Sequence, residues 1–175
     1  MDKLDVTIDS LVETIKDLVE LKSGEAKGLS FFVLAENEDT KNKFINSIFN
    51  LKDSIEPFYD SSHGSSHKVT FIDVTSGLES STLEDLIFPK GGDKRYKNIH
   101  RSANLAKLGR IVVVDNSQDL TMNTKRNQQF DMSLVRGLSS EPHNRIMVMI
   151  GTKSIMKMVE LDERLGQKSV CLNLR

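Results

Sequence analysis

The turn after the first expected strand has residues spaced like those of a phosphate-binding loop. In the pattern G-x-x-x-x-G-K-[ST], the glycines let backbone N–H groups wrap the phosphates, the lysine reaches them, and the hydroxyl binds Mg²⁺. This chain places Ala35, Thr40, Lys41 and Asn42 at the four fixed positions. Both glycines and the hydroxyl are missing, so we expect no cofactor here. If ATP or GTP with Mg²⁺ does bind, its contacts would be Thr40, Lys41 and Asn42.

Acidic side chains also argue against a nucleotide in this turn. Glu36, Glu38 and Asp39 lie within the same eight residues. Two unit charges about 4 Å apart repel by roughly 4 kcal/mol at an effective dielectric of 20, and one lysine does not offset three acids. The pattern favours an acidic turn in which Asp39 or Thr40 caps a helix. A surface that binds something cationic is the remaining alternative.

Two further carboxylates stand at the ends of expected strands. Asp115 follows the four apolar residues 111–114, and Asp73 ends the run 68–73. Ligands of open α/β sheets bind at the carboxyl ends of the strands, so both positions are candidate sites. In an active enzyme, Asp115 would bind Mg²⁺ through water and Asp73 would polarise the attacking water. The alternative for each is a turn that caps the next helix, and we expect neither a catalytic nor a metal-binding residue.

Residues 90–101 combine flexible glycines, several cations and the ring of Tyr96. Phosphate contacts plus a stacking ring are the ingredients of a nucleic-acid loop, although a solvated basic loop has the same composition. We expect an anionic partner here, either nucleic acid or an acidic protein surface. The candidate contacts are Lys90, Lys94, Arg95, Lys97 and Arg101.

Composition restricts the class of partner further. Of 175 residues, 24 are Lys or Arg and 25 are Asp or Glu, and the net charge of −1 excludes a uniformly basic polyanion binder. The balance hides an asymmetry, because residues 1–39 hold ten acids and four bases while residues 90–110 hold seven bases and one acid. A single cysteine excludes an internal disulfide. No apolar run reaches the roughly 18 residues of a membrane span and no secretory signal begins the chain, so we expect a cytoplasmic protein without a membrane partner.

Short apolar runs separated by helical stretches must position these side chains. The runs are 29–35, 68–73, 110–115, 145–151 and 169–174, with a weaker one at 96–100, and the helical stretches are about 44–51, 120–138 and 154–165. Strands that are apolar on both faces and alternate with helices describe a parallel sheet covered on both sides. We therefore predict an α/β fold over residues 28–175: a doubly wound, mostly parallel sheet of five or six strands with helices on both faces.

Residues 1–27 are expected to form an amphipathic helix that precedes this domain. Apolar residues recur there every three or four positions, with charged residues between them. Five of them also fit the four-three spacing of a short coiled coil: Leu4, Ile8, Leu11, Ile15 and Leu18. Such a helix either packs on its own domain or joins two chains, and we predict that it is the oligomerisation element.

The order of these features resembles the core of the RecA/KaiC-like P-loop ATPases over roughly residues 28–175. A first strand with a loop at the phosphate position precedes two strands that end in Asp73 and Asp115. The resemblance implies that Lys41 stands at the loop lysine, Asp115 at the metal carboxylate and Asp73 near the catalytic carboxylate. A weaker resemblance is to the small GTPases, whose guanine-reading N/T-K-x-D is similar to Gly151-Thr152-Lys153-Ser154.

The departures from both families fall where a nucleotide is held, which implies a relative that does not hydrolyse nucleotide and serves assembly or regulation. We predict a non-catalytic regulatory or structural subunit that acts through protein–protein interaction, as a homo-oligomer or with another protein. One alternative is an ATP- or GTP-binding NTPase with an unorthodox phosphate loop. Another is a nucleic-acid-binding accessory protein that uses residues 90–101.

Overall fold

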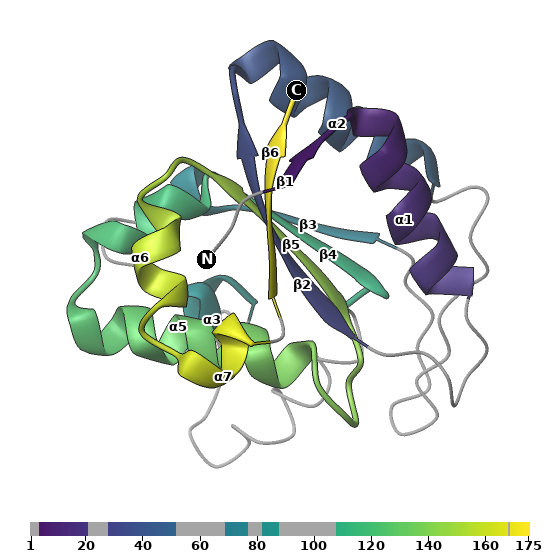
Figure 1. The fold of residues 1–175 in the computed structure, drawn as a ribbon. Coiled ribbons are helices and arrows are strands. Elements are labelled where there is room, and N and C mark those ends of the chain that lie inside the picture. The colour runs from purple at the N-terminus through teal and green to yellow at the C-terminus, as the bar shows by residue number, and fades with distance from the viewer. Residues whose placement is uncertain (1–3, 21–27, 52–68, 77–81, 88–107, 168) are drawn as a thin grey trace.

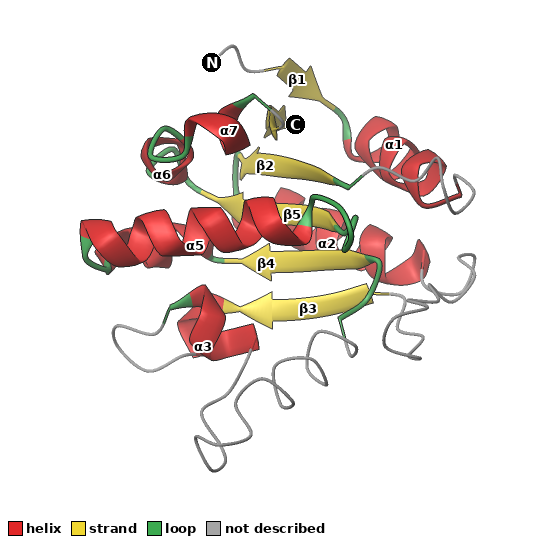
Figure 2. Cartoon of the chain, turned by 90° about the horizontal axis from the view of Figure 1, so that it is seen from below, coloured by secondary structure: helices red, strands yellow, loops and turns green. Residues whose placement is uncertain are grey.

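Six parallel strands form the sheet predicted from the apolar runs (Figure 1). The computed structural model describes residues 4–20, 28–51, 69–76, 82–87, 108–167 and 169–175. The strands are β1 (Leu4–Val6), β2 (Leu29–Ala35), β3 (Val69–Asp73), β4 (Ile111–Asp115), β5 (Ile146–Gly151) and β6 (Ser169–Leu174). They lie in the order β1-β6-β2-β5-β4-β3, so Figure 2 shows β1 and β3 at the two edges. The α/β prediction is confirmed.

Helices cover both faces of this sheet. They are α1 (Ile8–Glu20), α2 (Glu38–Leu51), α3 (Leu83–Ile87), α5 (Lys125–Leu138), α6 (Ile155–Val159) and α7 (Glu163–Gly166), with the short 3-10 helices η1 (Val74–Ser76) and η3 (Ser117–Met122). Figure 1 shows α1 and α2 on one face, and α3, α5, α6 and α7 on the other.

The apolar character of both strand faces follows from this double cover. Phe31 and Val33 of β2 pack into the cluster that contains the core residues of α1 and α2. Phe32 and Leu34 of the same strand pack into the opposite cluster, which contains the core residues of α3, α5, α6 and α7. Successive strand residues point to opposite faces of the sheet, so a strand that is covered on both sides does not alternate between apolar and polar residues.

The N-terminal segment differs from the single helix that was predicted. Leu4–Val6 is an edge strand that pairs in parallel with β6, and the helix begins only at Ile8. Thr7 caps this helix by accepting a hydrogen bond from the Ser10 N–H at 3.3 Å. Asp5 fixes the strand to β6, because its carboxylate accepts from the Asn173 side chain at 3.0 Å and pairs with Arg175 at 2.6 Å.

Two of the predicted helical stretches are divided by capping residues. The stretch 120–138 becomes η3 and α5, because Thr124 caps α5 through the Asn127 N–H. The stretch 154–165 becomes α6 and α7, because the Asp162 carboxylate accepts the Leu165 N–H at 2.9 Å. The weak strand predicted at 96–100 lies outside the described residues. In the part of the chain that the structure describes, no helix is both long and apolar enough to cross a membrane.

Candidate functional site

The link between β2 and α2 is a two-residue turn. β2 ends at Ala35 and α2 begins at Glu38. The helix is capped by Asn37, whose side-chain oxygen accepts the Thr40 N–H at 2.9 Å, so the predicted cap at Asp39 or Thr40 is wrong. Half of residues 35–40, which correspond to the glycine-to-glycine part of a phosphate loop, therefore already belong to the helix. Little loop is left whose N–H groups could wrap a phosphate.

Lys41 is turned toward the end of β4. Its ammonium group lies 2.9 Å from Glu38 Oε2 and 3.4 Å from Asp115 Oδ2, and it donates a hydrogen bond to Asn116 Oδ1 at 3.2 Å. The Lys41 side chain is 11 % exposed and the Asp115 side chain 9 %. Burial alone would lower the pKa of Lys41, but the hydrogen bond to Glu38 and the charge of Asp115 outweigh burial and raise this pKa.

Asn116 joins Lys41 to Asp73. Its backbone is left-handed, with φ 52°, a conformation that Asn tolerates better than most residues. Its side-chain amide donates to Asp73 Oδ1 at 3.0 Å, and the same oxygen accepts the N–H and hydroxyl of Thr75 at 3.0 and 2.7 Å. The Asn116 hydrogen bond lowers the pKa of Asp73 against the effect of burial, and Thr75 adds to the lowering. We call the five side chains of Glu38, Lys41, Asp73, Asp115 and Asn116 the Lys41 network.

The sheet explains why these residues meet. Asp73 and Asp115 are paired positions at the carboxyl ends of β3 and β4. β5 lies between β4 and β2, and it ends in Gly151. A Cβ on Gly151 would lie 2.9 Å from the Ser117 hydroxyl, which itself donates to the Ile150 carbonyl at 2.6 Å. The missing side chain thus lets η3 close over the end of β5.

The charged and polar groups of the Lys41 network already have partners within the chain. The Lys41 charge faces two carboxylates, Asp115 Oδ1 accepts the Asn116 N–H at 2.7 Å, and Asp73 Oδ1 takes three hydrogen bonds. Among the described residues, no three His, Cys, Asp or Glu side chains are grouped as metal ligands would be. Nucleotide or metal would have to compete with contacts that are already formed.

Three of the predicted site residues, Lys41, Asp73 and Asp115, are thus brought together. Thr40 and Asn42 lie on α2 beside Lys41, with Asn42 exposed. Asn116 was not predicted as a site residue, although an Asn directly after a strand-end Asp is a signal for a left-handed turn. The basic candidates Lys90, Lys94, Arg95, Lys97 and Arg101 lie outside the described residues.

The five predicted oligomerisation residues are divided between core and surface. Leu11 and Ile15 are buried in the chain's own core, Ile8 and Leu18 are partly buried against it, and Leu4 is exposed on β1. The helix therefore packs on its own domain. Self-association through this segment stays a prediction.

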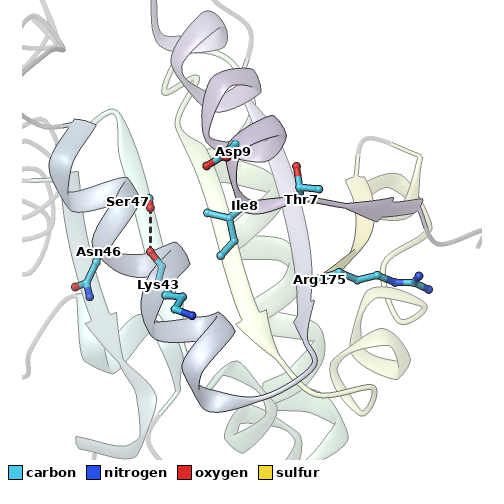
Figure 3. A pocket seen from close by; sticks show the side chains of 7 residues that line it. All are labelled: Thr7, Ile8, Asp9, Lys43, Asn46, Ser47 and Arg175. Carbon is cyan, nitrogen blue, oxygen red and sulfur yellow. Dashed lines mark hydrogen bonds between the residues drawn. The ribbon is translucent and has the colours of Figure 1, made fainter.

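A hollow of about 510 Å³ lies between the start of α1, the middle of α2 and Arg175 (Figure 3). It is lined by Thr7, Ile8, Asp9, Lys43, Asn46, Ser47 and Arg175. Lys43 pairs with Asp39 at 2.7 Å and Arg175 with Asp5, and Figure 3 shows Arg175 extending away from Lys43. The two cations therefore do not converge on one ligand position.

Comparison with known proteins supports the fold and leaves the activity open. Neither the protein-family models nor the curated protein sequences give a match. A chain from the structure of Drosophila ORC bound to GC-rich DNA and Cdc6 is similar, with a TM-score of 0.51 and 8 % sequence identity. The match covers 95 % of this chain and 28 % of that chain, so this chain spans little more than a quarter of that chain's length. At 8 % identity the likeness is one of fold alone.

Proposed function

We propose that this chain is a non-catalytic regulatory or structural subunit, which uses a P-loop NTPase-like fold for protein–protein interaction. The observation that carries the proposal is that the ammonium group of Lys41 is already paired with carboxylates of its own chain. The lysine at the position of the phosphate-loop lysine is bound by Asp115 and Glu38 of its own chain. In a nucleotide-binding P-loop protein the ammonium group of this lysine contacts the phosphates.

Electrostatics at the turn supports the same proposal. A phosphate placed at the start of α2 would lie beside the exposed carboxylates of Glu36, Glu38 and Asp39. These side chains are exposed, so each like-charge contact at about 4 Å costs on the order of 1 kcal/mol, the value for bulk water. The favourable field of a helix N-terminus contributes about 0.3–1 kcal/mol per charge, too little to offset three carboxylates.

Calorimetric titration with Mg-ATP and Mg-GTP tests the proposal. We expect no binding heat from the unaltered chain at millimolar nucleotide. The matched variant is the double substitution Glu36→Gln and Glu38→Gln, which removes two of the repulsive charges while keeping the size of the side chains. Micromolar binding by the unaltered chain, lost in Lys41→Met, would overturn the proposal and favour the NTPase alternative with Thr40, Lys41 and Asn42 as contacts.

The kind of partner is tested separately. Light scattering of the full chain distinguishes a homo-oligomer from a monomer that needs another protein. Leu4, which is 60 % exposed on the edge strand, is the first residue to alter, and Leu4→Gln is expected to reduce any self-association. Binding to DNA that weakens steeply with added salt would instead support the nucleic-acid alternative.

A further inference from the structure

Asp131 is a carboxylic acid inside the core between α5 and α3. The residue is 0 % exposed, and Leu83, Met132 and Val135 belong to the surrounding apolar cluster. Its Oδ1 accepts the N–H of Leu83, the first residue of α3, at 2.8 Å. Within the described part of the chain, its Oδ2 has no hydrogen-bond partner. A hydrogen bond to a buried acid therefore joins the start of α3 to α5, in addition to the apolar packing of Leu83 and Ile87.

The charged groups around Asp131 disfavour its ionised form. Glu84 and Asp85 of α3 are both acidic, and Asp85 is held near the start of α3 by the Thr82 hydroxyl at 2.9 Å. Asp131 forms no salt bridge with a cation in the described residues. The cations of α5 itself are paired or exposed, because Arg136 binds Asp162 at 2.9 Å and Lys125 and Arg126 are exposed. The charged side chains of α6 and α7 are exposed as well: Lys157, Glu163 and Arg164.

These surroundings set the proton affinity of the acid. Burial, joined by the charges of Asp85 and Glu84, raises the pKa of Asp131 to about 7, although the Leu83 N–H and the nearby Asn123 side chain act in the opposite direction. The Leu83 N–H and the Asn123 side chain together thus do not compensate the loss of water around the charge.

We propose that Asp131 is a pH-dependent latch for α3, which keeps this helix on α5 while the carboxyl group is neutral and releases it when the group ionises. In the neutral state the acid adds no charge to the apolar interface. After ionisation, detachment of α3 gives the carboxylate access to water and separates it from Glu84 and Asp85.

Hydrogen exchange of the α3 amides tests the latch. The Leu86 N–H, bonded to the Thr82 carbonyl at 3.2 Å, reports whether α3 is formed. After correction for the intrinsic pH dependence of exchange, we expect its protection to fall about tenfold or more between pH 6 and 8, within the limit of tenfold per pH unit that one proton allows. In Asp131→Asn, which retains an acceptor oxygen for Leu83 but does not titrate, protection is expected to stay constant over this range.

Two controls keep the test decisive. Asp162→Asn removes an acid from another contact of α5. In this variant the protection of the Leu86 N–H should depend on pH as it does in the unaltered chain. Should Asp131→Asn fail to fold, ¹³C NMR titration of the unaltered chain gives the Asp131 midpoint directly, and Glu84→Gln is expected to lower that midpoint. A carboxyl midpoint below pH 5, or equal protection of Leu86 at pH 6 and 8, would overturn the proposal.

Discussion

Lys41 and Asp115 form a buried ion pair whose two members depend on each other. Lys41→Met removes the positive charge and leaves the carboxylate of Asp115, only 9 % exposed at its side chain, without its cation. Breaking one side of a buried pair typically costs about 3–5 kcal/mol, so we expect a loss of about 3 kcal/mol in the free energy of unfolding, measured with urea. Lys43→Met is the matched control, because the Lys43–Asp39 pair is largely exposed and should lose less than about 1 kcal/mol. Equal losses in the two variants would contradict a structural role for Lys41.

Asn116 contributes both a backbone conformation and two side-chain bonds, and two substitutions separate them. Asn116→Gly loses the hydrogen bonds to Asp73 and Lys41 but adopts φ 52° without strain. Asn116→Ala loses the same bonds and also pays for the left-handed backbone, about 1–2 kcal/mol. We therefore expect the glycine variant to be the more stable of the two in thermal unfolding. In both, the pKa of Asp73 should rise toward its ordinary value, as NMR titration would show, because its first stabilising donor is gone.

At this scale the sequence predicted the acids but not their partners. Asp73 and Asp115 are visible as carboxylates after apolar runs, because a strand end is a local pattern. The contact of Lys41 with Asp115 depends on a strand order in which β5 alone separates β4 from β2, the strand that leads into α2, and no local pattern reveals the order of strands in a sheet. The internal neutralisation of Lys41 is therefore a tertiary property.

Two glycines show how differently the same substitution acts in different elements. A Cβ on Gly28, just before β2, would lie 2.7 Å from the Ser139 carbonyl carbon and 2.8 Å from the Arg145 carbonyl oxygen, both of them backbone atoms that cannot rotate away. Gly28→Ala is expected to cost about 1–3 kcal/mol or more, as for an overpacked site. Gly137→Ala, near the end of α5 with no atom within 4 Å, should instead stabilise by about 0.5–1 kcal/mol. Chemical denaturation of both variants checks the contrast, and a mild effect of Gly28→Ala would show that β2 and the 139–145 turn are not tightly packed.

The central strands were predictable because burial on both faces produces uninterrupted apolar runs. β2 and β6 match the predicted runs 29–35 and 169–174 at both ends. β1 was missed because Leu4-Asp5-Val6 also continues the helical period of the residues after it. Only the edge of β6, more than 160 residues later, selects the extended conformation, so the choice is made by tertiary pairing.

For the whole molecule, three aspartates give stability opposite dependences on pH. Asp131 has a raised folded pKa, so its contribution is complete below its ordinary value of 3.8 and is lost as the pH rises through about 7. Asp73 and Asp162 have lowered pKa values, so their contributions are present above 3.8 and are lost as the pH falls below it. These groups together predict maximum stability in mildly acidic solution.

Urea unfolding across pH 3–8 separates the two effects. In Asp131→Asn, the free energy of unfolding should no longer decline between pH 5 and 8, a decline on the order of 3 kcal/mol or less in the unaltered chain. The loss of stability below pH 3.8 should stay unchanged in this variant. Asp162→Asn should reduce only the loss of stability below pH 3.8, because the contact with Arg136 no longer depends on an ionised carboxylate. If the free energy of unfolding of Asp131→Asn still declines between pH 5 and 8, groups other than Asp131 cause the decline.

The position of β6 between β1 and β2 has a consequence for how the chain is made. β1 and β2 are translated before the other four strands, yet they do not pair with each other, since β6, which separates them, is the last of the six in chain order. Until β6 emerges, both early strands expose unpaired backbone N–H and C=O groups that other nascent chains can bind. The six-stranded sheet is therefore completed by insertion of β6 between two strands that are already made, and before that step their unpaired edges are sites where aggregation can begin.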